Sequence, residues 1–135
     1  SLLFCNTLQS YAESYGNYQG AIYLQNYDGD TIRFNLPGYP PIAGKDIRVR
    51  VNGIDTPEIK GKCKKEKYEA QQARDMVADI LKGAEKITLR NMKRGKYFRI
   101  AADVIIDGEN LADVLIEAGM AIKDDGGKKT HKWCE

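Results

Sequence analysis

An α+β fold is predicted by three observations on the sequence. Short segments rich in strand-forming residues flank one long segment in which apolar residues recur at helical spacing. Gly and Pro separate these segments without dividing the chain, and 135 residues with 42% apolar and 30% charged side chains suit a single globular domain. No apolar run approaches the roughly 20 residues that a membrane-spanning helix needs. We therefore expect one folded unit and no membrane partner.

Five short strands are expected, and turn signals set their boundaries. Asp28-Gly29 predicts a hairpin between the first two strands. Strict alternation in the third directs its aliphatic residues inward, so Arg48 and Arg50 share the outer face. A turn at residues 93–96 separates the last two strands. The predicted strands are residues 18–27, 31–36, 46–51, 86–92 and 99–106.

Two helices complete the expected order. Residues 64–82 carry apolar side chains on one face and end at Gly83, and a shorter helix over residues 111–118 ends at Gly119. The loop at residues 37–44 and the polar tail beyond Ile122 are expected to contain turns. A helix after the third of five strands is the order of an OB-type Greek-key β-barrel, a fold whose strands and loops commonly bind oligonucleotides.

The N-terminal residues differ in character from the rest. Residues 1–17 are expected to form an arm, and residues 18–135 a single domain. The arm begins with apolar residues and contains Ser10-Tyr11-Ala12, which has the small-x-Ala form of a signal-peptidase site. It is interpreted either as the remnant of a secretory signal, which predicts a secreted or periplasmic protein, or as a frayed arm.

The three cysteines follow the same two alternatives. In an exported protein, Cys63 and Cys134 would form a disulfide and Cys5 would belong to the signal. In a cytosolic protein all three would be free thiols.

Net charge gives little help with partners. A balance of +2 is too small to attract a polyanion over the whole surface, so nucleic-acid contact needs a local patch. Lysines follow Glu58 closely and form either such a patch or a solvated loop and helix start. They are Lys60, Lys62, Lys64, Lys65 and Lys67.

Two acidic motifs and two arginines carry the chemical signal. The acids are in Asp28-Gly29-Asp30-Thr31 and Asp55-Thr56-Pro57-Glu58, on segments expected to be neighbouring strands that also carry Arg48 and Arg50. Arg99 ends a further cationic and aromatic segment, Lys96-Tyr97-Phe98-Arg99. Carboxylates suit a hard cation and the planar arginine fork suits phosphate, so together these groups predict hydrolysis of nucleic acid.

Each motif alone has a simpler explanation. The first is typical of a structural hairpin turn and the second of a helix start, while single arginines on strands usually face solvent. Their joint occurrence favours a common site. His131, the only histidine, lies in the polar tail and is expected on the surface.

These motifs resemble the micrococcal nuclease (thermonuclease) family in their order and spacing. The second helix and the Met120-Ala121 pair after it are part of the same resemblance, which extends over about residues 22–121. The resemblance implies a five-stranded barrel with helices. It also implies a calcium-dependent phosphodiester hydrolase that cleaves DNA and RNA and leaves 3′-phosphate ends. Nothing in the sequence is built to read base edges, so little base specificity is expected.

The resemblance also implies roles for single residues. Asp30, Asp55 and the backbone carbonyl of Thr56 would bind Ca²⁺. Arg50 and Arg99 would bind the phosphate. Glu58 would act as general base.

Two neighbours of Arg99 are included in the same resemblance. Lys96 would contact the terminal phosphate, and Tyr97 the sugar or base. Phe98 departs from the family, which usually has glycine there, and this difference should stiffen or redirect the turn that carries Arg99.

The tail is the second departure. After Ala121 it is too short for the family's third helix and its tyrosine contact to the base, and Trp133-Cys134 stands there instead. A Cys63–Cys134 bond would hold the lysine-rich loop near the active site.

Two other functions compete with a nuclease. One is a non-catalytic nucleic-acid-binding module of OB type, and the other is a calcium- or peptide-binding barrel without phosphodiester chemistry. The binding module is disfavoured because the chain retains all the proposed catalytic and metal-binding residues, namely Asp30, Asp55, Glu58, Arg50 and Arg99. The calcium- or peptide-binding barrel is disfavoured because two arginines beside a cation site need an anion to neutralise them. We expect a monomer with DNA and RNA as substrates and no protein partner.

Overall fold

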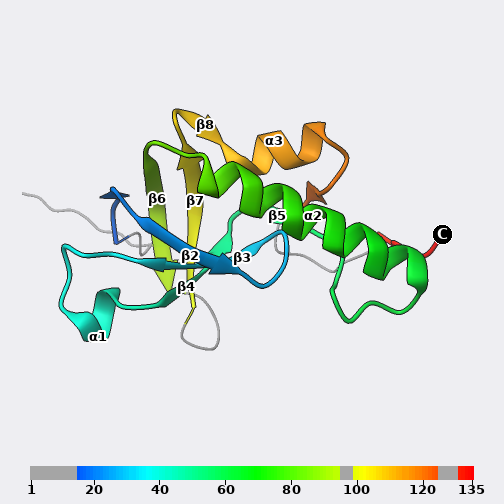
Figure 1. Ribbon diagram of the computed structural model, residues 1–135, viewed down its shortest axis with the longest axis horizontal. Helices are drawn as coiled ribbons and strands as arrows, with labels where there is room; N and C mark the ends of the chain where they lie inside the picture. Colours follow the sequence, from blue (N-terminus) through cyan, green and yellow to red (C-terminus); the bar gives the residue numbers. More distant parts are fainter. Residues whose placement is uncertain (1–14, 95–98, 125–130) are drawn as a thin grey trace, which may run out of the picture.

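The computed structural model describes residues 15–94, 99–124 and 131–135. The predicted order of strands and helices is present, with short elements added between its members (Figure 1). The elements are β1 (Tyr18–Gln19), β2 (Ile22–Asn26), β3 (Thr31–Asn35), α1 (Pro41–Gly44), β4 (Ile47–Val51), β5 (Ile54–Asp55), α2 (Lys64–Lys82), β6 (Ile87–Arg94), β7 (Ile100–Ile106), β8 (Glu109–Asn110), α3 (Leu111–Glu117) and β9 (Ile122–Lys123).

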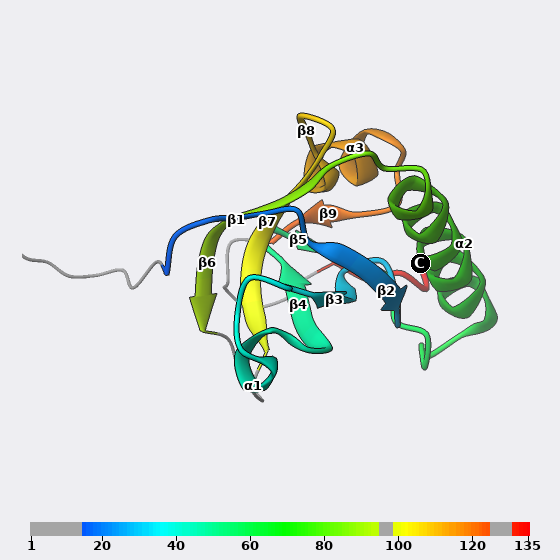
Figure 2. The same cartoon turned by 60° about the vertical axis from the view of Figure 1, so that its left-hand side comes forward.

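One curled, mixed sheet forms the body of the molecule. Its strands run in the order β1-β6-β7-β4-β3-β2, and β8 pairs with the C-terminal end of β7. The β4–β7 pair is parallel and the other pairs are antiparallel. In Figure 2, β4 runs beside β7, whereas β2 and β3 cross the direction of β6 and β7 at a large angle. This α+β arrangement is consistent with the OB-type fold that the sequence predicts.

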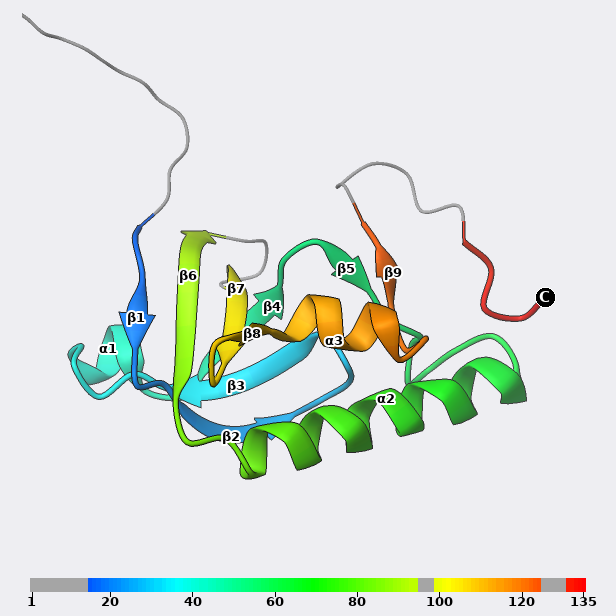
Figure 3. The same ribbon diagram turned by 90° about the horizontal axis from the view of Figure 1, so that it is seen from above.

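Helices α2 and α3 lie side by side along one flank of the sheet (Figure 3). The inner face of α2 buries Ala70, Ala73, Val77 and Leu81, four residues whose spacing gives one apolar stripe. Sheet residues such as Phe34 supply the opposite side of the same core. None of the described helices is both long and apolar enough to cross a membrane.

The structure differs from the prediction at the ends of elements. The expected strand over residues 18–27 is divided into β1 and β2, because Gly20 adopts a φ of 87° that redirects β1 to pair with β6. In the loop predicted at residues 37–44, the one-turn helix α1 begins at Pro41. The tail is not only turns, since β9 pairs with β5.

The described part of the predicted arm is attached to the sheet edge. The Tyr15 N–H donates to the Met92 carbonyl at 2.6 Å, and the Asn17 side chain accepts from the Asn91 N–H at 2.9 Å. Beyond Ala121 the described residues contain the strand β9 and no helix.

Candidate active site

The β2–β3 turn is built around the carboxylate of Asp28. Its Oδ1 accepts hydrogen bonds from the N–H groups of Asp30 and Thr31, at 3.1 and 2.9 Å. This local bonding pattern is why aspartate begins such turns. Asp28 is only 5% exposed, and burial, followed by the negative charge of Asp30, raises its pKa to about 7.

Gly29 brings this turn against the segment that follows β5. A Cβ atom at Gly29 would lie 2.9 Å from the Thr56 methyl group and 3.1 Å from Ala73 of α2. The missing side chain therefore lets two acidic motifs, distant in sequence, approach each other. The Thr56 N–H consequently donates to Asp30 Oδ2 at 3.2 Å.

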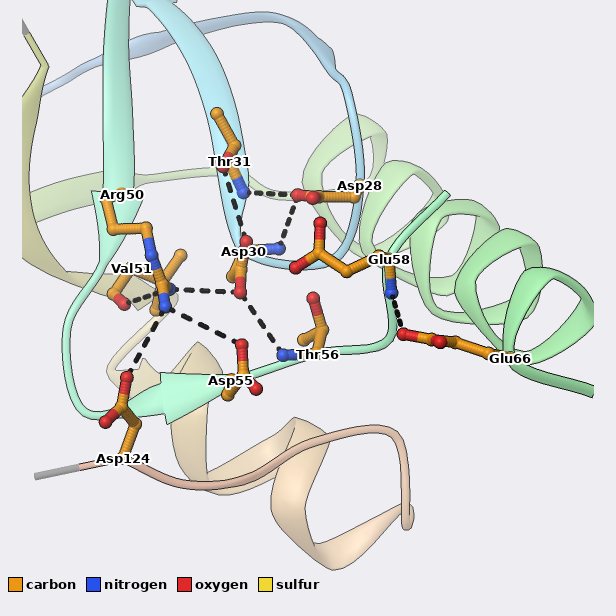
Figure 4. A network of polar contacts seen from close by, with 10 residues as sticks. All are labelled: Asp28, Asp30, Thr31, Arg50, Val51, Asp55, Thr56, Glu58, Glu66 and Asp124. Carbon is orange, nitrogen blue, oxygen red and sulfur yellow. Dashed lines mark hydrogen bonds and ion pairs between the residues drawn. The ribbon is translucent and has the colours of Figure 1, made fainter. Parts of the chain in front are cut away.

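Arg50 lies at the centre of the acidic groups (Figure 4). Its Nη1 is 3.1 Å from Asp30 Oδ2 and also donates to the Val51 carbonyl at 3.1 Å. Its Nη2 lies 4.0 Å from Asp55 Oδ1 and 3.7 Å from Asp124 Oδ2. These two separations exceed hydrogen-bond length, so one end of the guanidinium still has capacity to bind an oxyanion.

A cleft of about 640 Å³ opens beside this ion-pair cluster. Asp30, Arg50, Glu58 and Arg99, which the sequence assigns to one site, all line it. The Glu58 carboxylate is turned toward Asp28 and Asp30 (Figure 4). Asp55 joins the group through Arg50 rather than through the wall of the cleft.

Glu66 fixes the backbone that carries Glu58. Glu66 is 6% exposed, and its carboxylate accepts hydrogen bonds from the N–H groups of Glu58 and Lys62, at 3.1 and 3.0 Å. A Cβ at Gly61 would lie 2.6 to 2.8 Å from this carboxyl group, so glycine leaves room for the contact. Residues 56–60 are not helical, and α2 instead begins at Lys64 with the Cys63 sulfur as its N-cap.

Cys63 and Cys134, the pair expected in an exported protein, form a disulfide. The bond brings the C-terminus beside the start of α2 (Figure 3). The Cys134 sulfur lies 3.8 Å from Glu66 Oε1, and Lys65 Nζ donates to the Trp133 carbonyl at 3.0 Å. The tail and the loop that bears Glu58 are therefore joined.

The donor groups fit an open site for a hard cation. Among the described residues no three acidic, imidazole or thiol side chains form a ready metal cage. Asp30 and Asp55 are nonetheless both 6% exposed, and the buried hydroxyl of Thr56, the residue after Asp55, has no hydrogen-bond partner within the described ranges. The carboxylates of Asp30, Asp55 and Asp124 also gather around one guanidinium, that of Arg50. Oxygen donors in this number suit Ca²⁺, whose remaining ligands would be water and substrate.

Several other residues singled out in the sequence either lie outside the described part of the structure or do not line the cleft. Lys96 and Tyr97, with Phe98, lie outside the described residues. The lysines after Glu58 are exposed, but none of them lines the cleft. His131 is exposed, as expected, with its ring 4.4 Å from that of Trp133.

Three residues at the site, Asp124, Tyr27 and Glu66, were not singled out by the sequence analysis. Asp124 was assigned to a polar tail, and only the pairing of β9 with β5 brings it to Arg50. Arg48 and Tyr27 also line the cleft. Arg48, unlike Tyr27, was expected from the strand alternation, which puts it on the outer face with Arg50.

The fold is α+β, and its curled sheet holds acidic residues and arginines around one cleft. A site of this kind is suited to bind a phosphate-bearing ligand together with a cation. Residues 48–132 match the family described as Staphylococcal nuclease homologue. The match covers more than half of the 135 residues, and the chain belongs to this nuclease family. No match was found among curated proteins. The family match begins after Asp30, so the position of Asp30 in the site rests on geometry.

Proposed function

We propose that the protein is a calcium-dependent nuclease that hydrolyses phosphodiester bonds of DNA and RNA with little base specificity and leaves 3′-phosphate ends. One observation carries the proposal: Arg50 contacts the carboxylates of Asp30 and Asp55 at the edge of a cleft that Glu58 and Arg99 also line. Membership of the nuclease family supports the same chemistry.

The arginines are suited to bind the phosphate during the reaction. Phosphodiester hydrolysis increases negative charge on the non-bridging oxygens, and a guanidinium donates two parallel hydrogen bonds to such oxygens. The Nη1 group of Arg50 contacts the Asp30 carboxylate and donates to the Val51 carbonyl, so the orientation of the guanidinium is fixed before substrate binds. Arg99 directly precedes β7, the strand that pairs with β4 on the side away from β3. It would therefore approach the phosphate from a second direction.

Glu58 is suited to accept a proton from the attacking water. Its carboxylate lies in the cleft, while its own N–H is bonded to Glu66, which limits movement of the backbone. Asp30, Asp55 and the Thr56 carbonyl are the groups that would hold Ca²⁺. When bound, the ion would offset charge on the phosphate.

The disulfide supports a further part of the proposal, that the protein works in a secreted or periplasmic setting. Disulfides persist in oxidising compartments and are rare in the cytosol.

The test is cleavage of end-labelled single-stranded DNA, in calcium and in EGTA. The wild-type protein should cleave only in calcium, and Glu58→Gln should lower kcat about 100-fold or more. Glu109→Gln, at an exposed position on β8, is the matched control and should retain full activity.

Full cleavage in EGTA would refute the calcium dependence, and undiminished turnover by Glu58→Gln would remove Glu58 from the mechanism. DNA binding without cleavage under any divalent cation would favour the non-catalytic binding module.

A further inference from the structure

Three arginines form a row across the outer face of the sheet. Arg33 of β3 is directly opposite Arg48 of β4. In the parallel pairing of β4 with β7, Val49 is opposite Ile100, so Arg99 follows the same register beside Arg48. All three line the cleft described above.

This row is unfavourable in isolation. Like charges on directly opposed strand positions repel, because their Cβ atoms lie only about 5 Å apart. Asp46 neutralises Arg33, with Nε to Oδ1 at 2.7 Å. Arg48 is exposed and has no hydrogen bond or ion pair to another residue in the described ranges. The pKa of Asp46 is lowered chiefly by its hydrogen bond with Arg33, and the charge of Arg48 adds a smaller contribution. A bound anion would remove this repulsion.

An aromatic side chain stands at the same cleft. Tyr27 is 51% exposed and makes no ring contact with another aromatic residue that the structure describes. Its N–H donates to the Thr31 carbonyl at 3.0 Å, so the turn that holds Asp30 also fixes the backbone of Tyr27. Exposed aromatic rings beside a cationic groove are the arrangement with which proteins bind single-stranded nucleic acid.

The spacing of the two strand arginines matches a chain of phosphates. Residues two apart on a strand lie about 6.7 Å apart on the same face, so Arg48 and Arg50 are separated by about one step of an extended polynucleotide. Because the base faces of all four nucleotides can stack, a tyrosine at this position would not demand a sequence.

We propose that Arg48 and Tyr27 form a second nucleotide subsite, in which Arg48 binds the phosphate adjacent to the scissile one and Tyr27 stacks on a base of single-stranded substrate. The inference rests on the proposed function, since it places the scissile phosphate at Arg50. It assigns to this cleft a preference for polynucleotides over substrates with one phosphodiester.

The test compares two substrates in calcium: a ten-nucleotide oligothymidylate, and a nitrophenyl ester of thymidine with a single phosphodiester. Arg48→Ala and Tyr27→Ala should each lower kcat/KM on the oligonucleotide about tenfold and leave the ester unchanged. Tyr27→Phe should restore the oligonucleotide activity, because stacking needs the ring and not the hydroxyl. Arg90→Ala, an exposed arginine on β6 outside the cleft, should match wild type on both substrates.

A binding measurement separates the subsite from catalysis. In a Glu58→Gln background, affinity for the labelled oligonucleotide is measured against salt concentration. Adding Arg48→Ala should reduce the slope of log K against log salt by about 0.7, the value for one phosphate contact on a single strand.

Equal losses on the two substrates, no loss on either, or an unchanged salt slope would overturn the subsite while leaving the nuclease proposal intact. If wild type cleaves neither substrate, the proposed function fails. The salt slope and the Tyr27→Ala affinity then decide whether the subsite binds nucleic acid.

Discussion

Replacing Asp28 with asparagine should stabilise the calcium-free protein at alkaline pH and have little effect near pH 4. Asparagine retains the Oδ1 acceptor for the N–H groups of Asp30 and Thr31, so the turn is preserved. What the substitution removes is a negative charge that is buried beside Asp30.

The size of the effect follows from the pKa of Asp28, which is about 7 in the folded protein against 3.8 for an ordinary aspartate. Between these two values the folded state binds more protons than the unfolded chain, so the stability of the wild-type protein falls as pH rises. A difference of about three pKa units corresponds to about 4 kcal/mol, which is fully lost only above pH 7. Asp28→Asn should therefore exceed wild type by up to about 4 kcal/mol at pH 8.

The assay is urea unfolding in EGTA from pH 4 to 8.5, on wild type and Asp28→Asn. Asp79→Asn, at an exposed position on α2, is the control and should show no comparable change with pH. A variant that is less stable than wild type at pH 8, or a difference that does not change with pH, would refute the assignment of a costly buried charge to Asp28.

Three further predictions concern the groups around the cleft. Arg50→Ala should lower the free energy of unfolding in EGTA by about 3 kcal/mol, because buried carboxylates lose their counter-charge. In the same urea titration, calcium should reduce this difference in stability between the variant and wild type. An equal difference with and without calcium would contradict the prediction. Glu66→Gln should lower kcat about tenfold with little change in KM, because one of two bonds to the loop of Glu58 is lost, and steady-state kinetics with unaltered kcat would exclude this positioning role. Opening the Cys63–Cys134 bond, which spans 71 positions, should lower stability by about 4 kcal/mol, and a thermal midpoint that dithiothreitol leaves unchanged would disprove that contribution.

Local patterns predicted most of the fold. Alternation in β4 and the apolar stripe of α2 are properties of short segments, and both elements form where these patterns indicate. The added strands are different, because β5 and β9 exist only through pairing with each other. A two-residue strand has no periodicity of its own, so tertiary contact alone defines it.

The candidate site divides along the same line. Asp30 and Arg50 were recognisable because each belongs to a motif with fixed spacing, and the structure brings them to 3.1 Å. Asp124 and Glu66 had no such signal, since one lies in a polar tail and the other among lysines at the start of a helix. Their roles depend on the β5–β9 pairing and on the missing side chain at Gly61.

Calcium titration by calorimetry tests the central claim most directly, because the account requires Asp30 and Asp55 to bind one ion together. Wild type should bind one Ca²⁺, more tightly when a nucleoside 3′,5′-bisphosphate is present, since phosphate oxygens complete the ligand set. Asp30→Asn and Asp55→Asn should each weaken binding at least tenfold, whereas Asp79→Asn should bind as wild type does. Calcium affinity that is the same in wild type and in both site variants would contradict the shared metal site.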